Sequence, residues 1–490
     1  MRSCGSAVFA ALGFLASSFT LGEASERSGW LHPADRVAGK GWVGDYTLKD
    51  SAQAFELKSV VEGGGGSLIA AGDLDDVTVE GMDACLLSVN PQGSPLWLKI
   101  IKTSQRDWFE QVIRTSDGGL ALGGYLNYSS GQSAHGVWLA KLASNGAVQW
   151  QKSFTKNGAD IYFGCLLQNV SGDLFVFMRA GTGSLWILKL TAGGTMLWQK
   201  SYSPSTTLEI NVTLPPGDLE SFPGGAGPNV VATPDGGVLM TTVGLTLMPP
   251  SLTDLAVVKF DSNGNVVWAR SYPMTWAGHQ MWTLIPSTGI VRLTDGSFVL
   301  NGEALDSTGV SNRILTVGID QNGARLWGTL LDPELKSGSL GTWNLAGPVP
   351  TRGSRFFQCF TRIDNDENLS DMNMLKMAAS GKFAQSRKWD WAWLHASASI
   401  LVPTADGGAA GARSSSLMRF DSTGRFGNPA SWGALCKTVS KKWSPVFDTT
   451  PAVDITQSIS STPTTGTLAN TKMTFIAVSK TRIEVAFSCR

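Results

Sequence analysis

The chain has 490 residues, and its Lys and Arg residues (39) equal its Asp and Glu residues (39), so the formal net charge at neutral pH is zero. This balance excludes the strongly basic class of protein that binds nucleic acid or anionic membranes through its overall charge. Charged residues make up only 16% of the chain, whereas glycine (56 residues) and tryptophan (18 residues) are abundant, which favours an all-β protein with many tight turns.

The first residues predict an export signal. One arginine is followed by an apolar run and then by small residues, and the segment 22–24 forms an acceptable cleavage site. The alternative is that the same residues form an uncleaved membrane anchor. No later stretch of the sequence is long and apolar enough to span a bilayer. We therefore expect residues 1–24 to be a signal peptide and the mature protein to be secreted, either periplasmic or extracellular.

Residues 25–54 are expected to form an N-terminal arm. Within this arm the segment 41–48 (GWVGDYTL) precedes the first full repeat. It could add a strand to the last repeat and so close a ring, or it could remain a loose extension. The sequence leaves both possibilities open.

Residues 55–432 repeat one pattern with a period of roughly fifty residues, which is typical of β-repeat architectures. Each unit has a strand, a Gly-rich turn, an apolar strand, a second apolar strand, an Asn-Gly type hairpin and a fourth strand. Glycine supplies the positive φ angle that both turns require. The first-turn glycines are Gly66, Gly118, Gly172, Gly236, Gly296, Gly353 and Gly407, and the hairpin glycines are Gly93, Gly146, Gly194, Gly264, Gly323, Gly381 and Gly424. We predict a β-propeller of four-stranded blades with seven blades, six and eight being the alternatives.

The fourth strand of each unit alternates and carries an aromatic stripe. In one unit Val148, Trp150, Lys152 and Phe154 share a face, which predicts packing of these rings against the neighbouring blade, with the lysine stem lying over them. The tryptophan follows the hairpin glycine by four residues at Trp97, Trp150, Trp198, Trp268 and Trp327, whereas the last two units have Gln385 and Asn428 there.

The stretch VVKFDSNGNVVWARSY (residues 257–272) resembles bacterial β-propeller repeats with the pattern DGG, an apolar strand with glycine, and a strand ending K-x-D-x-x-G-x-x-x-W. It also resembles the tryptophan-docking repeats of quinoprotein dehydrogenases and outer-membrane assembly propellers. The resemblance covers residues 55–427 and is strongest in the second to fifth units. It implies a propeller fold and an exported protein. Quinoprotein dehydrogenases carry adjacent cysteines beside their cofactor, and no such pair occurs here.

Five cysteines follow the expected signal. Cys85, Cys165 and Cys359 lie in apolar strands of different units, where we expect them to be buried as small hydrophobic residues. Cys436 and Cys489 flank the C-terminal tail, and we predict a disulfide between them in an oxidising compartment.

Two segments are candidate ligand sites. Trp276, His279 and Trp282 lie on the connection between the fourth and fifth units and could bind a sugar or peptide, although packing between blades also accounts for them. Asp364, Asp366 and Asn368 place oxygen ligands at alternate positions, as calcium loops do, although a solvated acidic loop is the alternative.

A second acidic run, Asp73 to Asp76 with Glu80 and Asp83, has the same two interpretations. The longest insertion, residues 204–228, joins the third and fourth units, and such loops on rigid scaffolds often bind ligands. The Thr/Ser-rich tail, residues 433–490, predicts an extended or loosely ordered segment that ends in one or two strands.

These observations favour a secreted, monomeric propeller that acts as a non-catalytic scaffold at the cell envelope or outside it. Its expected partner is a protein or carbohydrate ligand, not nucleic acid, and no cofactor is required, with calcium possible. The alternative is a carbohydrate-active enzyme, a hydrolase or lyase, with carboxylates gathered at the axial face from several blades. A cluster of acids with a raised pKa in a central pocket would distinguish this enzyme from the scaffold.

Overall fold

The computed structural model describes residues 41–489, which belong to one compact unit. Outside the description lie residues 50, 52, 77–80, 102–105, 129–135, 157–160, 181–183, 205–207, 210–228, 247–251, 277–278, 281, 306–311, 332–341, 346, 365–368, 392–399, 426–437, 440–445, 449–450, 455–458, 464–465 and 472. The described elements are strands and two single-turn 3₁₀ helices, η2 (Gly64–Gly66) and η6 (Lys480–Arg482). None of the helices in this described part could cross a membrane.

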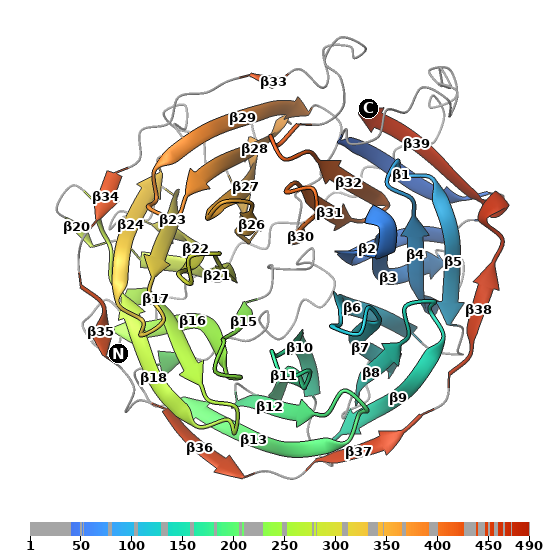
Figure 1. Cartoon of the computed structure of the whole chain (residues 1–490), viewed down its shortest axis with the longest axis horizontal. Coiled ribbons are helices and arrows are strands. Elements are labelled where there is room, and N and C mark those ends of the chain that lie inside the picture. Colours follow the sequence, from blue (N-terminus) through green and yellow to red (C-terminus); the bar gives the residue numbers. More distant parts are fainter. Residues whose placement is uncertain are drawn as a thin grey trace, which may run out of the picture. The chain divides into compact units, whose positions relative to one another are not determined.

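Antiparallel strands form four-stranded blades around a common centre, as a β-propeller (Figure 1). Regular blades along the first part of the chain are formed by β2 (Gln53–Glu62), β3 (Leu68–Asp76), β4 (Gly81–Val89) and β5 (Pro95–Ile101), then by β6 (Arg106–Arg114), β7 (Leu120–Tyr128), β8 (Gly136–Leu142) and β9 (Val148–Thr155), and then by β10 (Ile161–Gln168), β11 (Leu174–Ala180), β12 (Ser184–Leu190) and β13 (Met196–Pro204). In the next blade β14 (Leu208–Glu209) and β15 (Val230–Ala232) both pair with β16 (Val238–Thr246), which is followed by β17 (Leu252–Phe260) and β18 (Val266–Tyr272), and the blade after it contains β21 (Trp282–Arg292), β22 (Phe298–Leu305), β23 (Asn312–Ile319) and β24 (Arg325–Leu331). In the following blade β25 (Thr342–Leu345) and β26 (Val349–Thr351) both pair with β27 (Arg355–Asp364), which is followed by β28 (Leu369–Ala378) and β29 (Phe383–Trp391), and the last blade combines β30 (Ile400–Pro403), β31 (Ala409–Arg413) and β32 (Ser416–Phe420) with β1 (Trp42–Leu48).

The first strand of each blade lies nearest the centre, as the labels β2, β6, β10, β15, β21, β26 and β30 show in Figure 1. Neighbouring strands are antiparallel, so the turn after the first strand and the hairpin after the third strand lie at the same end of a blade. We call this end the turn face. The connections between blades, and between second and third strands, lie at the opposite end, the loop face.

The turn face is built from the predicted glycine turns. Every glycine of both series has a positive φ angle, such as 78° at Gly118 and 77° at Gly146. A cation of the third strand then fixes the first turn. Lys141 Nζ lies 2.9 Å from Asp117 Oδ2, and the same pairing joins Lys259 to Asp235 at 2.7 Å. The repeated Asp-Gly motif therefore encodes an ion pair within the blade as well as a turn.

This turn predicts a specific sensitivity to acid. Hydrogen bonds from Thr115 and Lys141 outweigh the effect of burial and lower the pKa of Asp117 to about 2. Because the folded-state pKa is depressed, its stabilising contribution is complete above about pH 4 and is lost as the pH falls toward 2. For Asp117→Asn we expect a lower free energy of unfolding at pH 7 and a shallower loss below pH 4, measured by urea denaturation across this range. An unchanged pH dependence in the variant would contradict this assignment.

The aromatic stripe of each fourth strand contacts the next blade, as predicted. Trp150 Nε1 donates to the carbonyl oxygen of Ala192 at 2.9 Å, and Trp198 Nε1 donates to that of Ser262 at 3.3 Å. Both acceptors lie two residues before the hairpin glycine of the following blade. Lys200 Nζ lies 5.7 Å from the centroid of the Trp198 ring. The repeated tryptophan is therefore a hydrogen-bonded contact between blades.

A tyrosine four residues after the tryptophan makes a second contact between blades. Tyr202 is buried, and its hydroxyl donates to the carbonyl oxygen of Gly264 at 2.5 Å. In the β6 blade Phe154 occupies the matching position, so a phenyl ring fits this site. We therefore expect Tyr202→Phe to lower the free energy of unfolding by about 1 kcal/mol, the value of the lost hydrogen bond, in urea denaturation. A change near zero would show that the hydroxyl contact adds nothing.

The segment 41–48 forms β1, which pairs with β32 along Trp42–Asp45 and serves as the fourth strand of the β30 blade. Trp42 Nε1 donates to the carbonyl oxygen of Pro91 at 2.8 Å, and Tyr46 Oη donates to that of Gly93 at 2.7 Å. Trp42 and Tyr46 thus stand where the other fourth strands have tryptophan and tyrosine. The N-terminal strand supplies the tryptophan that the last repeat lacks.

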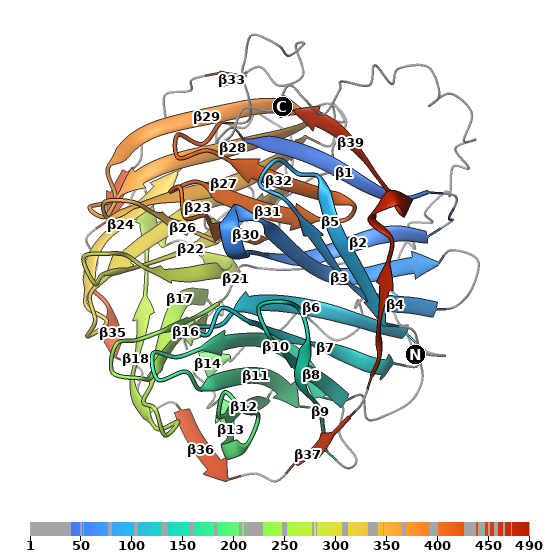
Figure 2. The same ribbon diagram turned by 45° about the vertical axis from the view of Figure 1, so that its right-hand side comes forward.

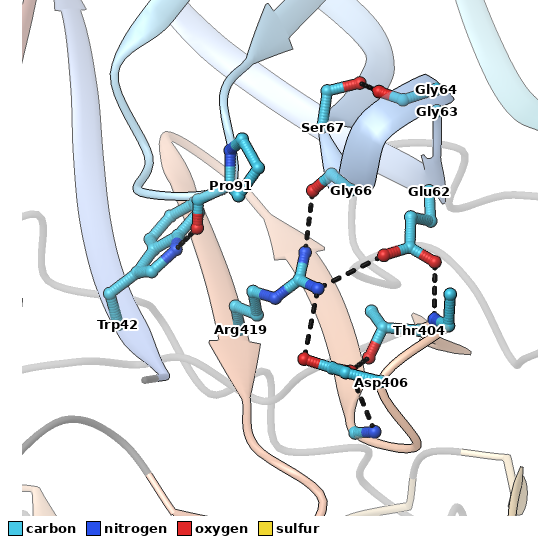
Figure 3. Close-up of polar contacts among 12 residues, drawn as sticks. Trp42, Glu62, Gly63, Gly64, Gly66, Ser67, Pro91, Thr404, Asp406 and Arg419 are labelled. Carbon is cyan, nitrogen blue, oxygen red and sulfur yellow. Dashed lines mark hydrogen bonds and ion pairs between the residues drawn. The ribbon is translucent and has the colours of Figure 1, made fainter. Parts of the chain in front are cut away.

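An arginine joins the two blades at this junction, which we call the seam (Figure 3). Arg419 Nη2 lies 3.1 Å from Glu62 Oε1 and 3.3 Å from Asp406 Oδ2, and Nη1 donates to the carbonyl oxygen of Gly66 at 2.9 Å. The other carboxylate oxygen of Glu62 accepts from the amide of Ala405 at 2.5 Å. Charge-assisted hydrogen bonds therefore tie the turns of the last blade to those of the first.

A belt of short strands within residues 438–489 adds a fifth strand to the outer edge of each described blade. Figure 2 shows the red segment passing from β37 through β38 to β39, which lies beside β1. The pairs run against the chain order: β33 (Thr438–Val439) on β29, β34 (Val446–Asp448) on β24, β35 (Val453–Asp454) on β18, β36 (Ile459–Pro463) on β13, β37 (Thr467–Asn470) on β9, β38 (Phe475–Val478) on β5 and β39 (Ile483–Cys489) on β1. The Thr/Ser-rich tail is thus extended and paired along much of its described length.

Candidate active site

Two β-bulges on the innermost strands create a polar site near the centre. Lys58 is the extra residue of β2 between Leu57 and Ser59, and Glu110 is the extra residue of β6 between Phe109 and Gln111. A bulge leaves its extra residue outside the ladder and redirects the side chain. The two bulges bring side chains from adjacent blades together.

Glycines in the second strands allow these bulges to form. A Cβ atom on Gly72 would lie 2.0 Å from the carbonyl oxygen of Glu56, and one on Gly124 would lie 2.1 Å from that of Trp108. Both distances are far below any real contact, so no larger residue fits without moving the backbone. The glycines of the second strands are therefore the sequence signal of the site.

Lys58 lies between two carboxyl groups. Its Nζ atom is 3.3 Å from Asp73 Oδ2 and 3.8 Å from Glu110 Oε1. The Asp73 side chain is fully buried, whereas 17% of the Lys58 side chain and 28% of the Glu110 side chain are exposed. Glu56 is half-buried on the same inner strand as Lys58. We call Glu56, Lys58, Asp73 and Glu110 the acid cluster.

One carboxyl group of the acid cluster, that of Asp73, has a raised pKa. Burial raises the pKa of Asp73 to about 6, the attraction of Lys58 opposes this rise, and repulsion by Glu56 and Glu110 adds to it. Burial lowers the pKa of Lys58, but the attraction of Glu110 and Asp73 outweighs burial, so the pKa lies above its usual value. Three carboxyl groups thus surround one ammonium group, and Asp73 binds its proton more tightly than an ordinary aspartate.

Aromatic side chains hold the exposed carboxyl group in place. Trp108 Nε1 donates to Glu110 Oε1 at 2.5 Å, and Lys58 Nζ lies 5.1 Å from the centroid of the Trp108 ring. Tyr125 packs on Trp108 with ring centroids 4.7 Å apart, and its hydroxyl accepts from the amide of Phe163 at 2.7 Å. The Glu110 carboxylate is therefore fixed by groups of its own blade and of the β2 and β10 blades.

The sequence-predicted ligand residues lie elsewhere. Trp276, in β19 (Thr275–Trp276), pairs with His279, in β20 (His279–Gln280), across a two-stranded hairpin, and Trp282 begins β21. The side chains of these three residues lie outside the described set, so their role in binding stays a prediction.

The predicted metal and disulfide residues fall mainly outside the description. Asp364 ends β27, paired with Leu369, whereas Asp366 and Asn368 are not described. Among the described residues, no group of three or more His, Cys, Asp or Glu side chains could hold a metal ion. Cys489 ends β39, but Cys436 is not described, so the disulfide stays a prediction.

Cys85, Cys165 and Cys359 are buried free thiols, as expected. The expected signal peptide, residues 1–24, and residues 210–228 of the long insertion lie outside the described residues. Earlier in that insertion, β14 pairs with β16 and so places a short strand on the edge of this blade.

The acid cluster was missed because its members are far apart in the sequence. Only Asp73 belonged to a segment that we considered, and a calcium loop and a solvated acidic loop were the two interpretations given for that segment. The structure separates Asp73 from that run by burying its side chain against Lys58. The glycines opposite the bulges were visible in the repeat pattern, but they do not reveal which side chain each bulge carries.

No protein-family model and no curated protein matches the chain. Solved structures similar to it include an α-L-arabinanase of Penicillium chrysogenum in complex with arabinobiose, at 11% identity over 72% of this chain and 99% of that chain, with a TM-score of 0.37. A GH43 β-1,3-galactosidase is 12% identical over 80% and 96% of the two chains, with a TM-score of 0.29. An endo-1,5-α-L-arabinanase of Thermotoga petrophila is 10% identical over 78% and 100%, with a TM-score of 0.24.

These findings correct the prediction of a non-catalytic scaffold. The similar solved structures include enzymes named for their action on carbohydrates.

Proposed function

We propose that the chain is a carbohydrate-active hydrolase whose acid–base groups are those of the acid cluster. The observation that carries the proposal is that Lys58 lies between buried Asp73, with a pKa of about 6, and partly exposed Glu110. Hydrolysis of a glycosidic bond requires carboxyl groups in different protonation states. The acid cluster meets this requirement below about pH 6, where Asp73 carries a proton.

Exposure distinguishes the roles of the residues. Glu110 reaches the surface of the cluster, so we assign it the contact with the glycosidic bond, where its protonated form gives a proton to the leaving oxygen. Glu56 is the second partly exposed carboxyl group, and we assign it the opposite side of the sugar. Asp73 is buried and acts through Lys58 as a positioning residue, because its protonation changes the charge that Lys58 offers to Glu110 and Glu56.

The proposal extends to the architecture and location of the protein. We infer seven blades, since the described strands group around seven innermost strands, in agreement with the glycine series. We further propose an exported, monomeric protein of the tryptophan-docking repeat type that binds a polysaccharide outside the cytoplasm. The N-terminal signal pattern and the hydrogen-bonded tryptophans between blades support this proposal.

The test is a panel of arabinans, galactans and other polysaccharides, with chromatographic analysis of the products. We expect release of shorter sugars from at least one polymer. Asp73 is protonated below about pH 6, so kcat/KM should decline as the pH rises through 6. The Asp73→Asn variant should not show this decline. Absence of products from every polymer, or turnover that persists unchanged in Glu110→Gln, would overturn the proposal.

A further inference from the structure

We propose that the outer edge of β1 is a docking site for an extended peptide, that its ligand is the chain's own strand β39, and that docking of β39 keeps the seam closed. In every other described blade, the belt strand pairs with a fourth strand that directly follows the third strand of that blade in the sequence. β1 alone comes from the opposite end of the chain, so its hold on the last blade depends on strand pairing and packing rather than on a short connection.

The pairing of β1 is divided unequally between its two neighbours. β32 pairs with the first four residues, Trp42 to Asp45. β39 pairs with Val43 and with every residue from Gly44 to Leu48. In the second half of β1, from Tyr46 onward, the ladder partners are β39 and a single residue of β2, Ala54 at Thr47. The Lys49 amide donates to the carbonyl oxygen of Arg482, just before β39, at 2.7 Å, whereas the Tyr46 amide donates to that of Ser415, in the last blade, at 2.8 Å.

Side chains of β39 add an apolar contact to the pairing. Ile483 is 8% exposed and belongs to the same core cluster as Tyr46, Leu48 and Leu417, and Val485 packs against that cluster. Residues 483, 485 and 487 share one face of the strand, so the docking site selects for alternating apolar residues. By contrast, β35 is short and exposed, with two pairs to β18. The belt therefore has a firmly bound end on β1 and weaker strands elsewhere.

The test compares proline substitutions in two belt strands of the full-length protein. Proline removes a backbone donor and disrupts strand pairing. In Glu484→Pro, which replaces the residue opposite Thr47, we expect amide hydrogen exchange at Thr47 and Lys49 to accelerate by roughly tenfold or more, since the amides of these alternate residues face β39. In the matched control Val453→Pro, in β35, exchange in β1 should be unchanged.

A peptide supplied in trans separates docking from a general loss of stability. The peptide corresponding to residues 483–490, added to Glu484→Pro, should restore slow exchange at Thr47 and Lys49, whereas a scrambled peptide of the same composition should not. Equal exchange at these two amides in Glu484→Pro and the parent protein would overturn the proposal. So would acceleration in Val453→Pro equal to that in Glu484→Pro, or failure of the peptide to restore protection.

Discussion

Replacing Glu110 with glutamine is expected to lower kcat on the responsive polysaccharide by at least about 100-fold, the usual contribution of a positioned acid or base. The amide keeps the size of the side chain and can still accept the Trp108 hydrogen bond, but it cannot exchange a proton. Because substrate contacts elsewhere are unchanged, KM should stay close to that of the parent. Steady-state kinetics at several pH values measures both constants.

Glu484→Gln is the matched control for this substitution. Glu484 is an exposed glutamate of β39, far in the sequence from the acid cluster, and its loss should leave kcat unchanged. The urea unfolding curve of each variant establishes that the blades remain folded. A Glu110→Gln protein with parental kcat would exclude Glu110 as the residue that acts on the sugar.

Replacing Arg419 with methionine is expected to lower the free energy of unfolding by about 3 kcal/mol or more. Methionine retains most of the apolar stem but leaves Glu62 without its cation at a site where only 10% of the glutamate side chain is exposed. A buried carboxylate without its cation lowers the free energy of unfolding far more than an exposed carboxylate without its cation. Urea denaturation followed by tryptophan fluorescence measures the change.

Lys259→Met separates the effect of the seam from the loss of any buried cation. Lys259 is buried like Arg419, but its partner Asp235 is 61% exposed and lies in the same blade. Water can therefore solvate Asp235 after the substitution, and the free energy of unfolding should fall by only about 1 kcal/mol. Equal losses in the two variants would show that the seam has no special sensitivity.

The blades could be predicted because their signals are local. A glycine with positive φ, an aspartate that binds its own turn and a tryptophan four residues after the hairpin act within one repeat or between successive ones. Each is therefore visible as a fixed spacing in the sequence. The ring-closing tryptophan was less obvious, although Trp42 and Tyr46 have the same spacing as Trp198 and Tyr202.

The belt and the acid cluster depend on interactions that composition does not record. Belt strands are held largely by main-chain pairing to edges that already exist, so a polar Thr/Ser-rich sequence can adopt them without an apolar pattern. The acid cluster depends on two bulges, and a bulge is a property of the ladder between two strands. Lys58 and Glu110 have no sequence spacing that could indicate that they share Asp73 as a neighbour.

The position of the belt in the chain has a consequence for biosynthesis. The strands that cover the outer blade edges are made after the described strands of the blades, and the last of them pairs with β1, the first strand that the structure describes. During synthesis, each completed blade therefore exposes an unpaired edge, which is the kind of surface that leads to aggregation. A growing chain of this protein should need protection by chaperones until its final fifty or so residues have emerged.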